Sequence, residues 1–343
     1  MYSINADGTG YQQVHSFVAS ELIGPTGLTL VGNKFYGMAA FGPNNVNNRG
    51  VVYSINQDGS GFQQLEAFTG PNGNLPTGQL VAVGSTLYGT TQSDGPAGHG
   101  EVFAINADGT NFHVVHAFAG GTSDGSAPTG LTVVGSELVG TSQGGGAQNL
   151  GTVFSMNTDG TGFQLLHSFV GTDGSGLKAS VAFDGSVLYG TASGGGPLNG
   201  GAVFSLNPDG SNFQLLHAFS QSGGPSGPAG ELAVINGKLM GTTSSGGNAH
   251  HGAAFSMTTD GASFEVLHLF PTASGEENGP NDQLILLGTT LYGTTNGSGN
   301  AGAVFALAVP EPSALVLALA LVGCATLIAC GVRRRRRSIA GVG

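Results

Sequence analysis

Residues 153–160 read Val-Phe-Ser-Met-Asn-Thr-Asp-Gly, an apolar run that ends in a turn signal. Asp-Gly between two apolar runs favours a β-hairpin, because glycine adopts positive φ without a Cβ clash. The pattern recurs with its Asp-Gly pairs 50 or 51 residues apart. The aspartates of these pairs are Asp7, Asp58, Asp108, Asp159, Asp209 and Asp260. This regular spacing predicts a tandem repeat over almost the whole chain.

Each repeat also carries a second landmark, which reads Leu-Tyr-Gly-Thr at residues 87–90. Four strand-like runs make up one unit, for example at residues 131–134, 138–141, 153–156 and 163–169. Gly, Asn and Pro bound these runs, and no helical period occurs before residue 313. Four antiparallel strands in a unit of this length are typical of a β-propeller blade. The sequence therefore predicts an all-β propeller of about six four-stranded blades over residues 1–308.

The two ends of the repeat region are staggered. Residues 2–5 and 11–17 supply only the last two strands of a unit. The C-terminal copy supplies three strands, near residues 283–287, 290–295 and 303–307. We therefore expect both ends to complete one shared blade that closes a six-bladed ring. An open β-solenoid is the alternative architecture.

Composition excludes several classes of protein. Glycine supplies 63 of 343 residues and charged side chains only 8%, yet apolar residues reach 39% and occur in short bursts. Disordered chains lack such bursts. Residues 1–308 carry 4 basic and 19 acidic side chains, a net charge of −15, which argues against nucleic-acid binding. Both cysteines, Cys324 and Cys330, lie beyond this region, so it contains no disulfide framework.

The repeats resemble the GloVer-type tandem repeats, named for the Gloeobacter and Verrucomicrobia lineages. The resemblance covers roughly residues 1–307 and rests on the Leu-Tyr-Gly-Thr, Gly-x-Val-Phe and Asn-x-Asp-Gly landmarks. It implies an exported repeat protein with interchangeable C-terminal anchors. It does not imply a known reaction.

The C-terminal tail has three parts in a fixed order. A short motif is followed by the uncharged residues 314–332 and then by a basic tail at 333–343, expected to be cytoplasmic. The motif consists of Val309, Pro310, Glu311, Pro312 and Ser313, and the basic cluster of Arg333, Arg334, Arg335, Arg336 and Arg337. Nineteen helical residues span about 28 Å, enough for the hydrocarbon core of a membrane. The sequence therefore predicts a transmembrane helix at 314–332, with the arginines cytoplasmic and the body on the other side.

This tail resembles a PEP-CTERM sorting signal. The resemblance implies that an exosortase-type processing enzyme recognises the motif and cleaves near it. It further implies a stay in the inner membrane during sorting and final delivery to the cell surface or extracellular matrix, where exopolysaccharide is an expected partner. An ordinary single-pass anchor is the alternative. Such sorting requires prior export, yet Met1 opens directly in repeat sequence, so we expect the true start codon to lie further upstream.

Repeated histidines are the most suggestive candidate chemistry. They are His15, His116, His167, His217 and His268, with Glu66 in the remaining unit. One position per blade keeps these side chains far apart, so we expect a structural role such as bonding to a loop. Adjacent His250 and His251 would point to opposite faces of a strand and have no partner at metal-ligand spacing.

Three further patterns have structural interpretations. The Asn-x-Asp-Gly turns lack the first ligand and the twelfth-position glutamate of a calcium loop. Residues 121–125 and 140–144 match G-x-S-x-G, but neither match leads into a helix, as the hydrolase elbow requires. We expect the recurring aromatic residues to pack between blades. They are Phe103, Phe154, Phe204, Phe255, Tyr88, Tyr189 and Tyr292.

These observations predict a non-catalytic exported surface or matrix protein with no cofactor. Structural calcium stays open, because loop acids could be weak cation ligands; these are Asp124, Asp173, Glu276, Glu277 and Asp282. The alternative is an extracellular polysaccharide hydrolase or lyase on the same scaffold. An active site would break the symmetry of the repeats, and the departures among these repeats are mostly in loop length.

Overall fold

A computed structural model describes residues 1–5, 7, 9–18, 21–42, 49–246, 251–270, 279–280, 283–295 and 303–308. The sorting motif at 309–313, the expected helix at 314–332 and the arginine cluster at 333–337 lie outside the described residues. Within the described ranges, no helix combines the length and hydropathy that a membrane crossing needs.

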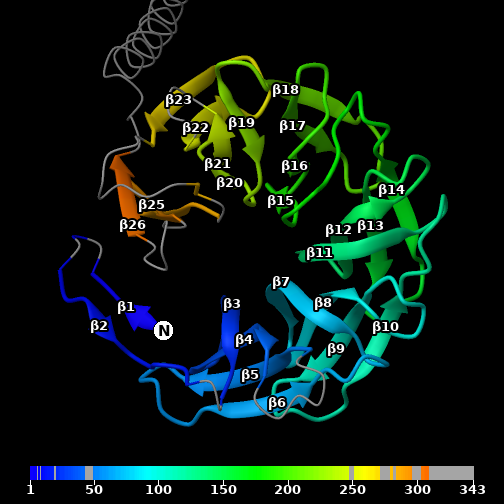
Figure 1. The fold of residues 1–343 in the computed structure, drawn as a ribbon, viewed down its shortest axis with the longest axis vertical. Helices are drawn as coiled ribbons and strands as arrows, with labels where there is room; N and C mark the ends of the chain where they lie inside the picture. The colour runs from blue at the N-terminus through cyan, green and yellow to red at the C-terminus, as the bar shows by residue number, and fades with distance from the viewer. Residues whose placement is uncertain are drawn as a thin grey trace, which may run out of the picture.

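The strands form antiparallel blades arranged in a ring, with the first strand of each blade nearest the centre (Figure 1). The first complete blade holds β3 (Ile23–Val31), β4 (Lys34–Phe41), β5 (Val51–Asn56) and β6 (Gln63–Ala67). The second holds β7 (Asn74–Val83), β8 (Thr86–Ser93), β9 (Glu101–Asn106) and β10 (His113–Ala117). The third holds β11 (Gly125–Val134), β12 (Glu137–Gly145), β13 (Thr152–Asn157) and β14 (Gln164–Ser168).

The later blades follow the same order with shorter inner strands. The fourth holds β15 (Ala182–Phe183), β16 (Leu188–Ala192), β17 (Asn199–Leu206) and β18 (Gln214–Ser220). In the fifth, β19 (Pro225–Pro228) and β20 (Ala233–Ile235) share the inner position before β21 (Lys238–Gly246), β22 (Ala253–Thr258) and β23 (Phe264–Leu269). In the sixth, the described residues form β24 (Ile285–Leu287), β25 (Thr290–Thr295) and β26 (Ala303–Ala308). The ring confirms the predicted all-β propeller of about six blades and excludes the open solenoid (Figure 1).

The predicted shared blade is wrong. The N-terminal strands β1 (Tyr2–Ser3) and β2 (Gln12–Gln13) pair with each other in a separate two-stranded sheet. Among the described residues, β26 pairs with β25 alone. The register of the hairpin, Tyr2 opposite Gln13, repeats that of Tyr53 opposite Gln64, so the hairpin is the outer half of a further blade. Pairing across a short loop costs less entropy than recruiting β2 to a strand near residue 305.

Aromatic rings pack the blades against each other, as the sequence predicts. The phenylalanine near the end of each fourth strand meets the aromatic residue on the third strand of the next blade, with ring centroids 4.9–5.4 Å apart. Phe118 against Phe154 is one such pair, at 5.0 Å, and both side chains are fully buried. Tyr88 and Tyr189 also belong to clusters that reach into the following blade. The core of this propeller therefore lies between blades.

Candidate functional site

The repeated histidines bond to loops and stack on the next blade, which is the structural role expected of them. His116 Nε2 lies 3.2 Å from Asp124 Oδ1, and the ring stacks on Phe163 at 4.0 Å. His167 repeats this arrangement with Asp173 at 2.9 Å and Phe213 at 3.7 Å. Two of the acids that the sequence offered as cation ligands, Asp124 and Asp173, are thus engaged by histidine. The other three, Glu276, Glu277 and Asp282, lie outside the described residues.

Other members of the repeated set vary this contact. His15 approaches Glu21 at 2.9 Å, and Asn72 donates to Glu66 Oε1 at 2.8 Å where glutamate replaces histidine. His217 stacks on Phe264 at 3.9 Å. His250 lies outside the described residues. Within the described part of the chain, no three His, Cys, Asp or Glu side chains are grouped as metal ligands.

The Asn-x-Asp-Gly segments are turns stabilised by their own side chains. Asp159 Oδ1 accepts hydrogen bonds from Thr161 N at 2.9 Å and Thr161 Oγ1 at 2.6 Å. These bonds lower the pKa of the Asp159 carboxyl, and Gly160 has a φ of 82° that suits glycine. The hydrolase-like match at 140–144 lies on strand β12, where Ser142 is buried against Thr152. The side chains of Asp159 and Ser142 are therefore engaged in turn and sheet contacts.

A different group of residues breaks the symmetry at the junction of the first two complete blades. Glu101 faces Thr91 across the β8–β9 pair. The same register position is apolar or a threonine in the other blades, where Val51, Thr152, Ala202, Ala253 and Ala303 occupy it. A carboxylate occurs at this position in one blade only. Column-by-column comparison of the repeats would have found it, whereas a search for recurring residues does not.

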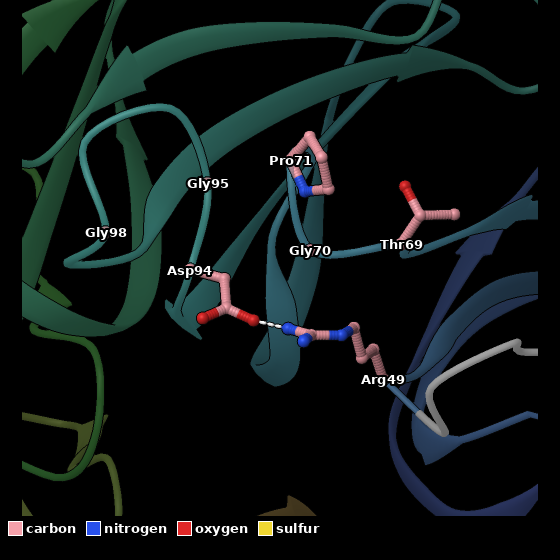
Figure 2. Close-up of a pocket in the computed structure, with 7 residues that line it drawn as sticks. All are labelled: Arg49, Thr69, Gly70, Pro71, Asp94, Gly95 and Gly98. Atoms are coloured by element: carbon pink, nitrogen blue, oxygen red, sulfur yellow. Dashed lines mark ion pairs between the residues drawn. The ribbon is translucent and has the colours of Figure 1, made fainter.

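Asp94 and Arg49, both half-buried, form the part of this site that lines a pocket. Their side chains make an ion pair that faces a pocket between the two blades (Figure 2). The pocket is lined by Arg49, Thr69, Gly70, Pro71, Asp94, Gly95 and Gly98. Asp94 has a φ of 60°, at a position where the next three blades have Gly145, Gly195 and Gly246 with positive φ. A non-glycine residue there costs about 1 kcal/mol, which marks Asp94 as a functional candidate.

Glu101 lies beneath these loops and is fully buried. Burial raises the pKa of its carboxyl to about 7, with no neighbouring cation to offset the rise. Both carboxylate oxygens and Thr91 Oγ1 are buried without a hydrogen-bond partner among the described residues. An unpartnered buried carboxylate is costly, so this arrangement requires a proton or a ligand.

A family match covers residues 1–196 and, as a second copy, residues 177–318. The chain belongs to the Gloeobacter/Verrucomicrobia repeat family. Both matches include the landmark residues from which the sequence predicted such repeats. No curated protein matches the sequence.

Several solved structures align with this repeat-family propeller. An oligogalacturonate lyase from Vibrio parahaemolyticus aligns over 90% of this chain and 83% of its own, with 12% identity and a TM-score of 0.58. A nidogen/laminin complex aligns over 76% and 87%, with 15% identity and a TM-score of 0.49. TolB from Acinetobacter baumannii aligns over 76% and 57%, with 14% identity and a TM-score of 0.45. At 12% identity, the likeness to the lyase shows a common fold alone.

Proposed function

We propose that this chain is a non-catalytic exported protein of the cell surface or extracellular matrix that binds exopolysaccharide. The observation that carries the proposal is the contrast between the repeated polar residues and the pocket. The repeated histidines and aspartates are engaged in loops and turns, whereas Arg49 and Asp94 depart from the repeat and face the pocket. Guanidinium and carboxylate groups are suitable partners for sugar hydroxyls.

Charge narrows the class of polysaccharide. Residues 1–308 carry a net charge of −15, so this region repels polyanions. The electrostatic repulsion has its longest range at low ionic strength. A neutral exopolysaccharide suits this surface better than a uronate-rich one. Membership of the repeat family supports export of this protein. An exported protein would encounter exopolysaccharide outside the cell.

A polysaccharide hydrolase or lyase is the second candidate. Asp94 precedes Gly95 in the chain, and Glu101 Oε2 lies 2.5 Å from the position of a Cβ on Gly95, so two carboxylates adjoin one glycine. A catalytic acid or base must come within about 3 Å of its substrate. Glu101 is fully buried and Asp94 is engaged by Arg49, which favours binding over catalysis.

The test measures binding and turnover with the full-length protein in detergent. We expect it to be retarded in gels that contain neutral bacterial exopolysaccharide and to release no new chain ends. Arg49→Ala should weaken binding by about tenfold, equivalent to about 1.4 kcal/mol. Lys178→Ala, an exposed cation in another blade, is the matched control and should bind like the parent. Release of unsaturated or reducing ends that Asp94→Asn abolishes would establish the enzyme instead.

We further propose that the tail at 309–343 sorts the protein through an exosortase-type processing enzyme. The support is the order of motif, apolar segment 314–332 and arginine cluster in the sequence. The test replaces Pro310 and Pro312 by alanine and follows the protein in its host by mass spectrometry. The parent should lose the segment after the motif and leave the inner membrane, while the variant keeps it. An intact tail on surface-delivered parent protein would contradict this proposal.

A further inference from the structure

Three side-chain oxygens converge beneath the loops of the second complete blade. Glu101 Oε1 and Thr91 Oγ1 lie 2.9 Å and 2.5 Å from the point where a Cβ on Gly73 would stand. Glu101 Oε2 lies 2.5 Å from the corresponding point on Gly95. A side chain at either glycine would displace the carboxylate, so the absence of a Cβ at both positions leaves room for it. The cover above these oxygens is therefore glycine backbone.

The loop backbone does not supply donors to the carboxylate. Gly73 N donates to Gly70 O at 3.0 Å, and Gly95 N donates to the same carbonyl at 2.8 Å. Neither Glu101 oxygen has a hydrogen-bond partner among the described residues, and Thr91 Oγ1 has none either. Both side chains are 0% exposed. The described residues therefore leave three buried side-chain oxygens without a hydrogen-bond partner.

The equivalent positions of other blades are satisfied internally. In the third blade, Ser142 Oγ and Thr152 Oγ1 bond to each other at 2.7 Å. In the fifth, Thr243 Oγ1 accepts from Ala253 N at 3.0 Å. The fold can therefore pair polar groups at this position. The second blade instead places a carboxylate opposite an unpartnered hydroxyl.

We propose that Glu101 and Thr91 bind a calcium ion beneath the Gly70–Gly73 and Asp94–Gly98 loops. The three oxygens are hard ligands, with no nitrogen or sulfur among them, and calcium takes six to eight such ligands from carboxylates, hydroxyls, carbonyls and water. Water would complete the shell of calcium, whose coordination geometry is flexible, whereas magnesium demands a near-ideal octahedron, which three oxygens fixed on two paired strands do not favour. With one carboxylate, the expected dissociation constant lies at the weak end, about 10⁻⁴–10⁻³ M.

The pocket provides the route to this site. Gly95 lines the pocket, and the position of its absent Cβ is 2.5 Å from Glu101 Oε2. An ion entering there passes Asp94, whose carboxylate faces the pocket (Figure 2). The calcium site is independent of the proposed polysaccharide binding, since it requires neither sugar nor Arg49.

The test follows thermal unfolding and calorimetric titration of the full-length protein after removal of metal with EDTA. Saturating CaCl₂ should raise the unfolding midpoint by about 5 °C and titrate as one site. NaCl and MgCl₂ at equal ionic strength should not. Glu101→Gln, which keeps the shape without the charge, should lose both signals, and Thr91→Val should weaken calcium binding at least threefold.

The matched control is Glu231→Gln, a half-buried carboxylate of the fifth blade that bonds to Ser180 and Gln283. It should keep the full calcium shift. The proposal is overturned by an equal shift in the Glu101 variant, by an equal shift with sodium or magnesium, or by no shift in the parent. A Glu101→Gln protein that is more stable than a calcium-indifferent parent would show that the carboxyl holds only a proton. Should Glu101→Gln fail to fold, the Thr91→Val titration decides.

Discussion

His116 shows how one side chain can join two blades and a loop. Its ring stacks on Phe163 of the next blade while Nε2 contacts Asp124 in the loop that follows β10. Asp124 also accepts from Ala119 N at 2.8 Å and from Gly125 N at 2.7 Å. Burial raises the pKa of Asp124, but the bonds from His116 and these two amides outweigh it, so the pKa is lowered overall. The carboxylate thus holds the loop in its charged form.

Replacing Asp124 by Asn should destabilise the protein by about 1–2 kcal/mol at pH 7, because the half-buried carboxylate that accepts these hydrogen bonds is lost. The folded pKa lies below the unfolded value of 3.8, so this contribution is present above pH 3.8 and disappears as the pH falls through the folded pKa. Urea unfolding across a pH series measures the difference from the parent. Exposed Glu265→Gln is the control and should stay within about 0.5 kcal/mol. A difference that persists unchanged to about pH 2 would contradict this mechanism.

Single residues also mark the limit of prediction from the sequence. The histidines and turn aspartates were predictable as structural, because recurrence itself indicates a role in the repeat. Glu101 was not found, because nothing local distinguishes it from other acids. Glu101 becomes a candidate site residue because it faces Thr91 across the sheet and lies beneath Gly73 and Gly95. Only the fold brings these residues together.

At the scale of the strand, the glycine of the Leu-Tyr-Gly-Thr landmark is explained by the aromatic residue opposite it. Gly140 on β12 pairs with Phe154 on β13, and a Cβ there would stand 2.3 Å from the ring. The same contact occurs at Gly89 under Phe103, at 2.5 Å. The ring covers the glycine and reaches the preceding blade. The two landmarks are therefore one packing unit that spans two strands.

Gly140→Ala should destabilise the protein by about 1–3 kcal/mol, because the added methyl group overpacks against Phe154. Gly224→Ala is the matched control, since a Cβ at that position meets nothing within 4 Å. Denaturant unfolding compares the two. Adding Phe154→Leu to Gly140→Ala should recover part of the loss, which a double-mutant cycle detects. A neutral Gly140→Ala would show that the ring moves aside without cost.

Strand positions were predictable to within a few residues because their signals are local. Residues 290–295 were predicted as a strand and form β25, and residues 153–156 lie within β13. The inner strands are longer than predicted in the third blade, where β11 begins at Gly125. Its extra length pairs with β12 through a register shift, and alternation in the sequence does not reveal a bulge.

Across the whole molecule, neighbouring blades are joined near the ring centre by threonine hydroxyls as well as by aromatic rings. Thr77 donates to Pro128 O at 3.2 Å, Thr141 to Ala179 O at 2.8 Å and Thr191 to Gly230 O at 3.2 Å. Stability in such a repeat protein is approximately a sum over blades and blade interfaces. The prediction of a shared blade failed because the sequence does not show whether strands about 290 residues apart pair with each other.

The two ends of the ring should consequently open before its middle. Among the described residues, β26 has no outer partner strand, and Ile285 and Leu287 of β24 are 66% and 57% exposed. Hydrogen exchange followed by mass spectrometry measures local opening directly. Amides in the β25–β26 pair should exchange at least tenfold faster than those in the equivalent β21–β22 pair, whose outer edge β23 covers. The comparison is matched, because each pair consists of the second and third strands of its blade and the two pairs have the same register. Equal protection would mean that the propeller opens as one unit and that its ends are joined in solution.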